Sequence, residues 1–341
     1  MSTTPITSPD SAELQGRIDR FQKVHADIVA EVRKVIVGQE EVIEQVLIAL
    51  FVGGHCLITG LPGTAKTLLV RTLSDALGLN FRRIQFTPDL MPSDITGTDI
   101  IEEDSITGKR TWTFVPGPIF SNVLLADEIN RTPPKTQSAL LEAMQERSCT
   151  VRGSQHIIAA PFFVLATQNP IELEGTYPLP EAQLDRFIFN TLLDYLTAND
   201  ELKVLDLTTT THLAKVVAVT NAAEIIDFQQ VVRMVPIADS VARYAVNLVR
   251  ATRPTDPSSP DFAKKYINFG ASVRAAQFLV LAAKARALVH KRYHVTYEDV
   301  TALMRPILRH RVLLNFQAES DRLTTDDLLL KLLEAMPAPK A

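Results

Sequence analysis

Cysteine is scarce in this sequence, and long hydrophobic runs are absent. Cys56 and Cys149 are the 2 cysteines among 341 residues, too few for a disulfide framework, so we expect reduced, buried thiols in a cytosolic protein. The most apolar stretch, residues 42–61, is interrupted by polar and charged side chains, whereas a membrane-spanning helix needs about 20 apolar residues. The N-terminus is polar and acidic, unlike a secretory signal. We therefore expect a cytoplasmic protein with no direct membrane insertion.

An excess of positive charge is also absent. The chain has 35 Lys and Arg against 39 Asp and Glu, a net charge of −4, and no long basic run. A protein that binds nucleic acid tightly without reading its sequence needs many cations facing phosphates, so we expect no nucleic-acid partner. Hydrophobic residues make up 46% of the chain and charged residues 22%, which is ordinary globular usage, and the length suits about two domains.

The pattern along the chain divides it into four segments. Residues 1–12 are rich in Ser, Thr and Pro, which predicts a disordered arm. Residues 13–196 alternate short apolar runs with helical segments, which predicts an α/β domain. Residues 197–226 look like a connector, and residues 227–341 predict a small domain made of helices only.

Short apolar runs with little alternation predict strands buried on both faces, joined by helical crossovers into a mostly parallel sheet. The expected strands are residues 56–59, 81–86, 123–126, 162–167 and 188–192. The expected helices are residues 13–35, 40–52 and 67–77 in the first domain and 227–234, 238–252, 271–291, 296–311 and 324–335 in the second. His310, between Arg309 and Arg311, is expected on a solvated helix face.

A glycine loop follows the first expected strand directly and leads into a helix. Its residues are Gly60, Leu61, Pro62, Gly63, Thr64, Ala65, Lys66 and Thr67. Strand, glycine loop, Lys-Thr and helix form the context of a P-loop, which binds the phosphates of a nucleotide such as ATP. The glycines let backbone N–H groups point at phosphate oxygens, and the helix N-terminus adds its positive dipole.

Two side chains of this loop carry most of its expected chemistry. Lys66 supplies a point charge to the β- and γ-phosphates, and the hydroxyl of Thr67 ligates Mg²⁺. The P-loop pattern has glycine where this chain has Ala65. Because alanine is the smallest substitution, we expect the loop to keep its shape.

A second motif, residues 123–128, is an apolar strand that ends in two carboxylates. Because α/β sheets place their ligands at the carboxyl ends of strands, this motif predicts a Walker B sequence. Asp127 would hold Mg²⁺ through water, and Glu128 would orient and deprotonate the attacking water. Together the two motifs predict a Mg²⁺-dependent ATP hydrolase.

In these two motifs and in several further segments, the sequence resembles the MoxR family of AAA+ ATPases over about residues 25–335. The matching segments are VIVGQ at 35–39, the loop at 60–67, LLADEINRTPPKTQSALLEAMQER at 124–147, ATQNP at 166–170, EAQLDRF at 181–187 and GASVRA at 270–275. The resemblance implies an AAA+ P-loop core, a mostly parallel sheet with flanking helices and two β-hairpin insertions, followed by a small all-α lid domain.

The resemblance also implies roles for residues outside the two motifs. Val37 and Gly38 would border the adenine, and Asn169 would help to place the attacking water as the sensor-1 residue. Arg186 matches the arginine finger, which reaches the γ-phosphate bound to a neighbouring subunit. Arg274, at the start of a lid helix, matches the sensor-2 arginine.

Three points around these arginines stay open. The family often has proline where Val273 stands, which leaves the starting angle of the following helix open. Whether Arg274 acts in its own or in a neighbouring site is open as well. Arg131, just after the Walker B carboxylates, is a second candidate for contact across a subunit interface.

Two β-hairpins are expected within the first domain. The first has strands 100–102 and 111–115 around a turn at 105–109, and the second has strands 149–152 and 155–158. In related AAA+ proteins such hairpins face the ring pore or the substrate. Trp112, the only tryptophan, lies in the first hairpin, where packing within the hairpin is the simpler expectation.

The resemblance implies a homo-oligomeric ring, most often a hexamer, that binds ATP at its subunit interfaces. Family members act like chaperones in the maturation or activation of protein complexes, with metal cofactor insertion among these tasks. They often act with a von Willebrand factor A-domain protein and a client complex.

Other functions stay open at this point. A nucleic-acid motor or loader shares the hairpins, but the acidic balance and the lack of a DNA-binding appendage argue against it. The sequence does not clearly distinguish this chain from a metal-chelatase motor subunit. A scaffold that binds but does not hydrolyse nucleotide is disfavoured, because Glu128, Asn169 and Arg186 are all present.

Overall fold

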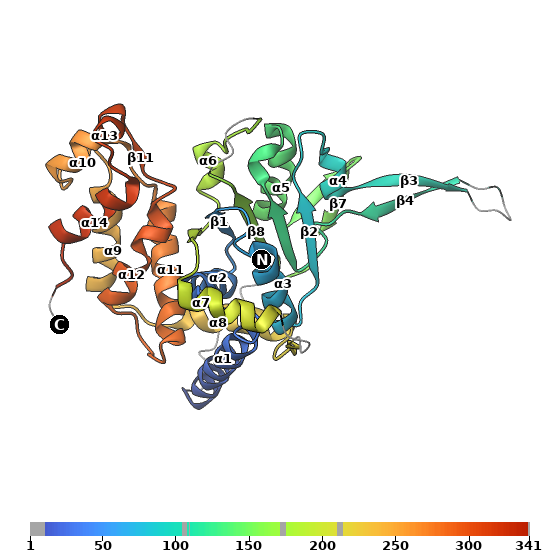
Figure 1. Cartoon of the computed structure of the whole chain (residues 1–341), viewed down its shortest axis with the longest axis horizontal. Coiled ribbons are helices and arrows are strands. Elements are labelled where there is room, and N and C mark those ends of the chain that lie inside the picture. Colours follow the sequence, from blue (N-terminus) through green and yellow to red (C-terminus); the bar gives the residue numbers. More distant parts are fainter. Residues whose placement is uncertain (1–10, 104–107, 109, 171–174, 210–213, 340–341) are drawn as a thin grey trace, which may run out of the picture.

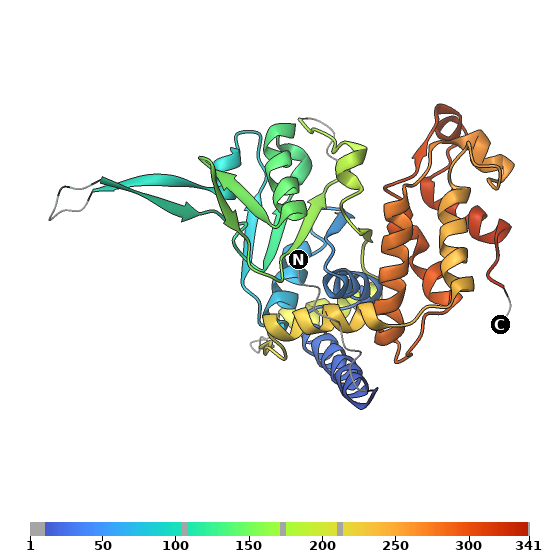
Figure 2. The same cartoon turned by 180° about the vertical axis from the view of Figure 1, so that it is seen from behind.

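The computed structural model describes residues 11–103, 108, 110–170, 175–209 and 214–339. An α/β core lies in the middle, a helical lid packs on one side of it, and a β-hairpin projects on the other side (Figure 1), as the reverse view also shows (Figure 2). The predicted arm at residues 1–12, apart from its last two residues, and most of the predicted turn at 105–109 lie outside the described residues. Within the described part of the chain, no helix has the length and apolar character needed to cross a membrane.

Five parallel strands form the central sheet in the order β2, β5, β8, β1, β9. Their bounds are Cys56–Gly60 (β1), Phe81–Gln85 (β2), Val123–Asp127 (β5), Phe163–Gln168 (β8) and Phe189–Leu193 (β9). In the centre, Cys56 of β1 lies opposite Leu165 of β8 and Phe189 of β9. The predicted parallel sheet is confirmed, and each expected strand is found within one residue at each end.

Both faces of the three central strands β5, β8 and β1 are largely buried, which explains why these strands are almost continuously apolar. The edge strand β2 differs, with Arg82 and Arg83 exposed. Val123 and Leu125 of β5 pack into a cluster formed with α1 (Ser11–Val32), α2 (Glu40–Val52) and α3 (Lys66–Ala76). Leu124 and Ala126 pack on the opposite face, in a cluster that includes α5 (Pro134–Glu146). Successive side chains of a strand point to opposite faces, so one apolar run supplies two cores.

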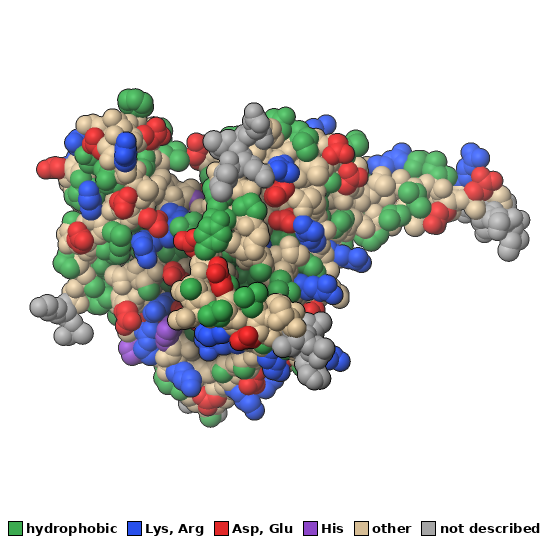
Figure 3. All heavy atoms as spheres, in the orientation of Figure 1, with side chains coloured by type: hydrophobic (Ala, Val, Ile, Leu, Met, Phe, Trp, Pro, Cys, Tyr) green, Lys and Arg blue, Asp and Glu red, His purple; other side chains and the backbone are tan. Residues whose placement is uncertain are grey.

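The two predicted hairpins are present and lie against each other. They are β3 (Gly97–Glu103) with β4 (Arg110–Pro116), entered through α4 (Pro92–Thr96), and β6 (Ser148–Val151) with β7 (Ser154–Ile157). Phe114 stacks on His156 with ring centroids 3.7 Å apart, and the guanidinium of Arg152 lies 3.8 Å from the ring centroid of Trp112. Trp112 therefore packs against the second hairpin, although 58% of it stays exposed. The space-filling view shows the arm projecting from the body of the molecule (Figure 3).

The segment 197–226, predicted as a connector, contains a helix. α7 spans Ala198–Thr208, and Thr197 caps it by accepting a hydrogen bond from the amide of Asp200. α8 (Ala222–Met234) begins five residues before its predicted start, with Asn221 as the capping residue. No side chain of α7 is buried, and its apolar residues, such as Val204, Leu205 and Leu207, line a pocket instead of packing into the core. The cap at Thr197 is the local signal of this helix.

The lid is helical, as predicted, and continues the core without a break in its apolar interior. Its helices are α9 (Asp239–Ala251), α10 (Asp261–Tyr266), α11 (Val273–Val289), α12 (Tyr297–Leu308), α13 (Phe316–Ser320) and α14 (Thr325–Ala335). A short ribbon of β10 (Ile267–Phe269) and β11 (Leu313–Leu314), not expected from the sequence, joins them. α11 packs against α2 and α8, so one cluster of buried side chains runs from the sheet into the lid.

The predicted solvated helix face at His310 is wrong. α12 ends at Leu308, three residues before the predicted end, and the following turn directs its side chains at the core. His310 Nε2 lies 3.0 Å from the carbonyl of Phe187, and Arg309 Nη1 donates to the carbonyl of Asn190 at 2.9 Å. Burial lowers the pKa of His310 well below its usual value. This turn is a polar bridge from lid to core.

A buried carboxylate organises the lid itself. Asp299, with no exposed side-chain surface, accepts hydrogen bonds from Arg286 (2.9 Å), from Arg292 (2.5 and 2.6 Å) and from the amide of Thr296 (2.9 Å). Burial raises the pKa of this carboxyl, but these hydrogen bonds outweigh it and hold the pKa below its usual value. The carboxylate is therefore ionised at neutral pH and fully satisfied.

Replacing this carboxylate should destabilise the lid strongly. Asp299→Ala removes the carboxylate partner of Arg292 and leaves Arg286 with only its ion pair to Glu44 at 3.3 Å. Removing one partner from comparable buried pairs costs about 3–5 kcal/mol. Chemical denaturation at neutral pH measures the loss, with Glu298→Ala, an exposed neighbour, as the matched control. Because the folded-state pKa is lowered, the contribution of Asp299 is complete above the ordinary pKa of aspartate and fades as the pH falls through the folded value. Equal stability of the two variants would contradict this account.

Candidate nucleotide site

The loop between β1 and α3 has the backbone shape of a P-loop. Gly63 (φ 80°) and Ala65 (φ 60°) both adopt left-handed conformations, and Lys66 opens α3. Ala65 thus keeps the loop's shape at a cost of roughly 1–2 kcal/mol, which glycine would avoid. The Lys66 ammonium donates to the carbonyl of Gly60 at 2.5 Å, so it lies over the loop rather than in solvent.

The first glycine of the loop is required by close packing. A Cβ on Gly60 would lie 2.6 Å from the carbonyl oxygen of Leu193 in the adjacent strand β9. A Cβ on Gly63, by contrast, would meet nothing within 4 Å. Gly60 therefore lets β9 approach the loop, while Gly63 supplies its left-handed turn on an open side.

The Walker B carboxylates lie at the end of β5, beside β8. The hydroxyl of Thr167 donates to Asp127 Oδ1 at 2.6 Å and accepts a hydrogen bond from the amide of Glu128 at 2.8 Å. Thr167 is 1% exposed, so its position is tightly determined. Glu128 itself has a left-handed backbone (φ 56°), which turns the chain at the end of the strand. One buried hydroxyl thus orients both acidic residues.

Strand β2 supplies two further partners that the sequence analysis did not identify. Arg83 donates to Asp127 Oδ2 at 2.6 Å, and Gln85 donates to Glu128 Oε2 at 2.7 Å. The two side chains are two residues apart on a strand whose register places Gln85 opposite Asp127. Because side chains two residues apart point to the same face of a strand, the sequence could have placed Arg83 and Gln85 on one face. Only the order of the strands shows that this face meets the acidic pair.

The P-loop lysine and the two acids share one electrostatic environment. Burial lowers the pKa of Lys66, and the charges of Asp127 and Glu128 act in the opposite direction. The Thr67 hydroxyl follows directly in the first turn of α3. A hydroxyl and a carboxylate are hard oxygen donors of the kind that Mg²⁺ takes together with phosphate oxygens, so the residues present fit an ATP–Mg²⁺ complex.

A pocket of about 410 Å³ adjoins the P-loop, a volume within the usual range for small-ligand sites. Its lining comes from the turn before α2, the P-loop, the start of α3, the end of β9 and helix α7. The residues are Val35, Ile36, Val37, Gln39, Gly63, Thr64, Ala65, Leu68, Leu69, Asp194, Tyr195, Leu196, Glu201, Val204, Leu205, Leu207 and Thr208. The helix that replaces the predicted connector is therefore one wall of this pocket.

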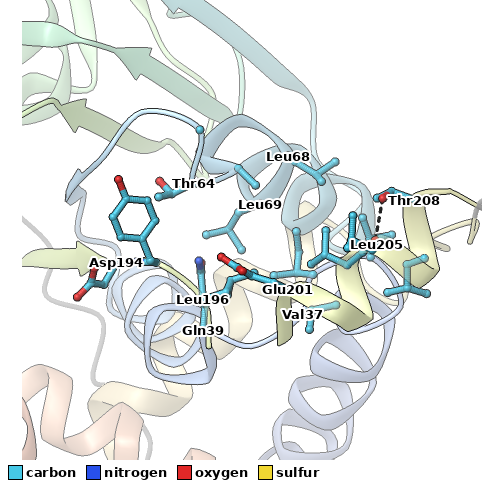
Figure 4. A pocket seen from close by; sticks show the side chains of 17 residues that line it. Val37, Gln39, Thr64, Leu68, Leu69, Asp194, Leu196, Glu201, Leu205 and Thr208 are labelled. Carbon is cyan, nitrogen blue, oxygen red and sulfur yellow. Dashed lines mark hydrogen bonds between the residues drawn. The ribbon is translucent and has the colours of Figure 1, made fainter. Parts of the chain in front are cut away.

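The walls of this pocket are mostly apolar and suit a flat base. Val37 lies on the side facing Leu205 of α7, while Leu69 approaches from α3 (Figure 4). Gly38 is not part of the lining, but its left-handed backbone (φ 67°) lets α7 approach, since a Cβ there would lie 3.3 Å from Asp200 Oδ2. Of the two residues expected to border the adenine, Val37 lines the pocket and Gly38 shapes its edge.

The remaining expected residues fall into two groups. Asn169, 7% exposed, directly follows β8 at the edge that carries the P-loop and the Walker B pair. Arg131 forms an ion pair with Glu128 at 3.3 Å in the same chain. Arg186 lies elsewhere: it precedes β9, and its Nη1 donates to the carbonyl of Leu141 at 2.6 Å. The structure brings the first two to the acidic pair and keeps the third apart from it.

The separation of Arg186 follows from strand direction. Leu193 pairs with Gly60 of the P-loop, and Phe189 pairs with Cys56 at the other end of β1. Those four steps along β9 span roughly 13 Å at about 3.3 Å per residue, and Arg186 lies beyond Phe189. Arg274 is held at the same far edge, 3.4 Å from the carboxylate of Asp185.

A five-stranded parallel sheet with a P-loop, an acidic strand end and a helical lid defines an AAA+ ATPase. The ATPase family associated with various cellular activities (AAA) matches residues 55–189, and the AAA lid domain matches residues 261–332. Chaperone MoxR1 of Mycobacterium tuberculosis is 39% identical over 92% of this chain and 81% of its own, and the uncharacterized protein YeaC of Bacillus subtilis is 42% identical over 91% and 93%. The chain belongs to the MoxR family of AAA+ ATPases.

A solved structure shows the same fold. A predicted ATPase from Cytophaga hutchinsonii is 39% identical, has a TM-score of 0.89, and matches 96% of this chain and 99% of its own. The fold class and family predicted from the sequence are therefore confirmed.

Removing the loop lysine tests the phosphate site. Lys66→Ala deletes the one side-chain cation of the loop sequence, and charge-assisted contacts are worth about 1.5–3 kcal/mol, roughly 10- to 150-fold in affinity. We expect at least this loss in ATP binding by calorimetry. Arg71→Ala, an exposed cation on the same helix, is the matched control and should bind ATP normally. Unchanged ATP affinity in Lys66→Ala would show that the loop is not the phosphate site.

Proposed function

We propose that this chain is a Mg²⁺-dependent ATPase that works as a ring and drives a chaperone-like change in other protein complexes. The observation that carries the proposal is the distribution of its functional groups over the two edges of one parallel sheet. The P-loop, Asp127, Glu128 and Asn169 lie at one edge, and Arg186 lies at the other. One chain alone then holds an incomplete catalytic centre.

Within one subunit, each group has a distinct role. The P-loop amides and Lys66 bind the β- and γ-phosphates, and Thr67 and Asp127 hold the metal ion. Bound Mg²⁺ neutralises charge that develops on the phosphate oxygens. Glu128, oriented by Thr167 and Gln85, accepts the proton of the attacking water, and Asn169 helps to place that water.

The missing cation comes from a neighbouring subunit. Arg186 donates from its guanidinium to the carbonyl of Leu141 in α5, far from its own P-loop, so a second copy is needed to bring an arginine finger to a γ-phosphate. Repetition of this contact is heterologous and closes into a ring when the rotation fits. AAA+ ATPases generally form such rings, and we propose a hexamer here.

We also propose that Arg274 acts in the neighbouring site. Its guanidinium lies 3.4 Å from Asp185, the residue directly before Arg186, and so both arginines are presented at the same edge. The sequence left open which site Arg274 serves, and this ion pair favours the neighbouring one.

The downstream role rests on the family. One relative carries the name chaperone MoxR1, which supports a chaperone-like function. A cytoplasmic location is also part of this proposal. Maturation or activation of protein complexes, metal cofactor insertion and a von Willebrand factor A-domain partner are proposals that follow from the family resemblance. The paired hairpins, with Trp112 and Ile157 exposed, are the surface we expect to meet a client.

Replacing the proposed base separates binding from chemistry. Glu128→Gln keeps the shape and a hydrogen-bonding group but cannot accept the proton, so hydrolysis should fall by about 100-fold or more. ATP binding should stay near normal, and the ring should persist longer in ATP. A phosphate-release assay and sizing in ATP measure these effects, with Asp75→Asn on the exposed side of α3 as the control. Normal turnover in Glu128→Gln would refute the role.

Mixing two inactive variants tests the shared site. Arg186→Ala subunits keep an intact P-loop, and Lys66→Ala subunits keep an intact finger. Each should be inactive alone, since arginine fingers contribute about 10³–10⁵ in rate. Mixed rings contain some complete interfaces, so partial ATPase activity should return. If the two variants assemble together and no activity returns at any ratio, Arg186 does not act across the interface.

A further inference from the structure

The side chain of Arg311 is buried between the lid and the core segment that carries Arg186. Only 2% of the Arg311 side chain is exposed. Its Nη2 donates to the carbonyls of Asp185 (2.9 Å) and Phe187 (2.5 Å), and its Nη1 donates to that of Ile188 (3.2 Å). Its Nε donates to the carboxylate of Asp185 at 2.7 Å. One lid side chain thus holds the chain on both sides of Arg186.

These contacts use the whole guanidinium. Nη1 also donates to the carbonyl of Ile307 in the lid, and the ring of Phe278 lies 5.2 Å from the guanidinium carbon. Burial lowers the pKa of Arg311 to about 10, so it stays charged at neutral pH. Arginine presents five N–H donors in one rigid plane, whereas lysine has three donors on a single flexible atom. Lysine would keep the charge and lose most of this pattern.

These contacts fix the direction in which the side chain of Arg186 leaves the backbone. Arg311 holds the peptide group directly before Arg186 through the carbonyl of Asp185, and it holds the second peptide group after Arg186 through the carbonyl of Phe187. The peptide group between these two is held by the amide of Phe187, which donates to the carbonyl of Leu184 at 3.1 Å. The amide of Ile188 donates to the carbonyl of His55, just before β1. With both flanking peptides held, the Cα–Cβ bond of Arg186 has one direction relative to the sheet. The side chain beyond it remains free to leave the carbonyl of Leu141.

We propose that Arg311 is a positioning residue for Arg186: it aims the finger at the neighbouring subunit and ties that aim to the lid. The proposal rests on the role of Arg186 across the interface proposed above. Since Arg311 belongs to the lid, movement of the lid in one subunit changes the finger that the next subunit receives. With 2% of its side chain exposed, Arg311 acts through Arg186 and not on the nucleotide itself.

A neighbouring arginine provides the contrast with a purely structural bridge. Arg309 also links lid to core, donating to the carbonyl of Asn190 at 2.9 Å and pairing with Asp326 at 2.8 Å. Its side chain is similarly buried, with 11% exposed. Asn190 lies inside β9, four residues after Arg186, so this bridge holds the strand and leaves the finger's flanking peptides alone. Arg309→Lys is therefore the matched control.

The test uses the full chain and mixed rings. Lys66→Ala subunits donate the finger, and Arg186→Ala subunits donate the P-loop. Arg311→Lys is placed first in the finger donors and then in the P-loop donors. In the finger donors it should lower the recovered kcat by about 10- to 100-fold, the cost of a misplaced catalytic group. In the P-loop donors the recovered kcat should stay within about twofold of the mixture without Arg311→Lys, because that subunit has no finger to misplace. The KM for ATP should be unchanged in both arms.

The outcomes separate this inference from the function on which it rests. If Arg311→Lys lowers the recovered kcat only in the finger donors, and Arg309→Lys shows no such asymmetry, the result supports Arg311 as a positioning residue. Equal loss in both arms, or none in the finger donors, overturns it. If the reference mixture without Arg311→Lys recovers no activity in assembled rings, the shared site itself is wrong, and the positioning role falls with it.

A second variant covers the case in which the lysine variant does not fold. Arg311→Gln keeps a planar donor group and removes the buried charge, and its melting temperature and assembly are measured first. The same two arms should give the same asymmetry. Symmetric effects of Arg311→Gln in folded rings would overturn the proposal as well.

Discussion

The common direction of the five parallel strands decides where each functional group of this chain can act. Strands β1, β5 and β8 end at one edge of the sheet, so the P-loop, the acidic pair and Asn169 meet there. The segment before β9 lies at the other edge and carries Arg186. No rearrangement of loops can bring these groups together within one subunit without breaking the sheet. This geometry is the basis of the site shared between subunits that we propose.

The lid and the hairpins extend from this sheet in opposite directions. The lid shares one buried apolar cluster with the core and adds polar contacts at a single turn. The turn after α12 grips the carbonyls that lead into β9, through Arg309, His310 and Arg311. On the other side, β7 leads into β8, whose Thr167 orients the acidic pair. The stacking of Phe114 on His156 joins the projecting first hairpin to β7, and β7 in turn precedes β8. The lid therefore contacts β9 through the side chains of that turn, and the second hairpin leads along the chain into β8.

Much of the core could be predicted from local sequence. The apolar runs of the five strands, Gly60 and Lys66 of the loop, and the carboxylates after β5 are each visible within about ten residues, because burial and phosphate binding impose short, regular patterns. Ala65 was a departure from the pattern, and the structure shows its backbone in the conformation that glycine would have taken. The family resemblance placed the remaining site residues, and the roles of Asn169, Arg186 and Arg274 stay predictions.

Other features depend on contacts between distant segments, which no local pattern encodes. Helix α7 has no buried side chain, so its sequence looked like a connector, yet it closes one wall of the pocket. Arg83 and Gln85 reach the acids only because β2 lies beside β5. His310 and Arg311 looked like surface residues because they are polar, and they are buried because the core offers carbonyls that need donors. The sequence alone determined the strands and the phosphate loop, since these depend on neighbours along the chain. The tertiary structure decided the partners of the charged side chains, since a buried charge is stable only where distant segments supply its hydrogen bonds.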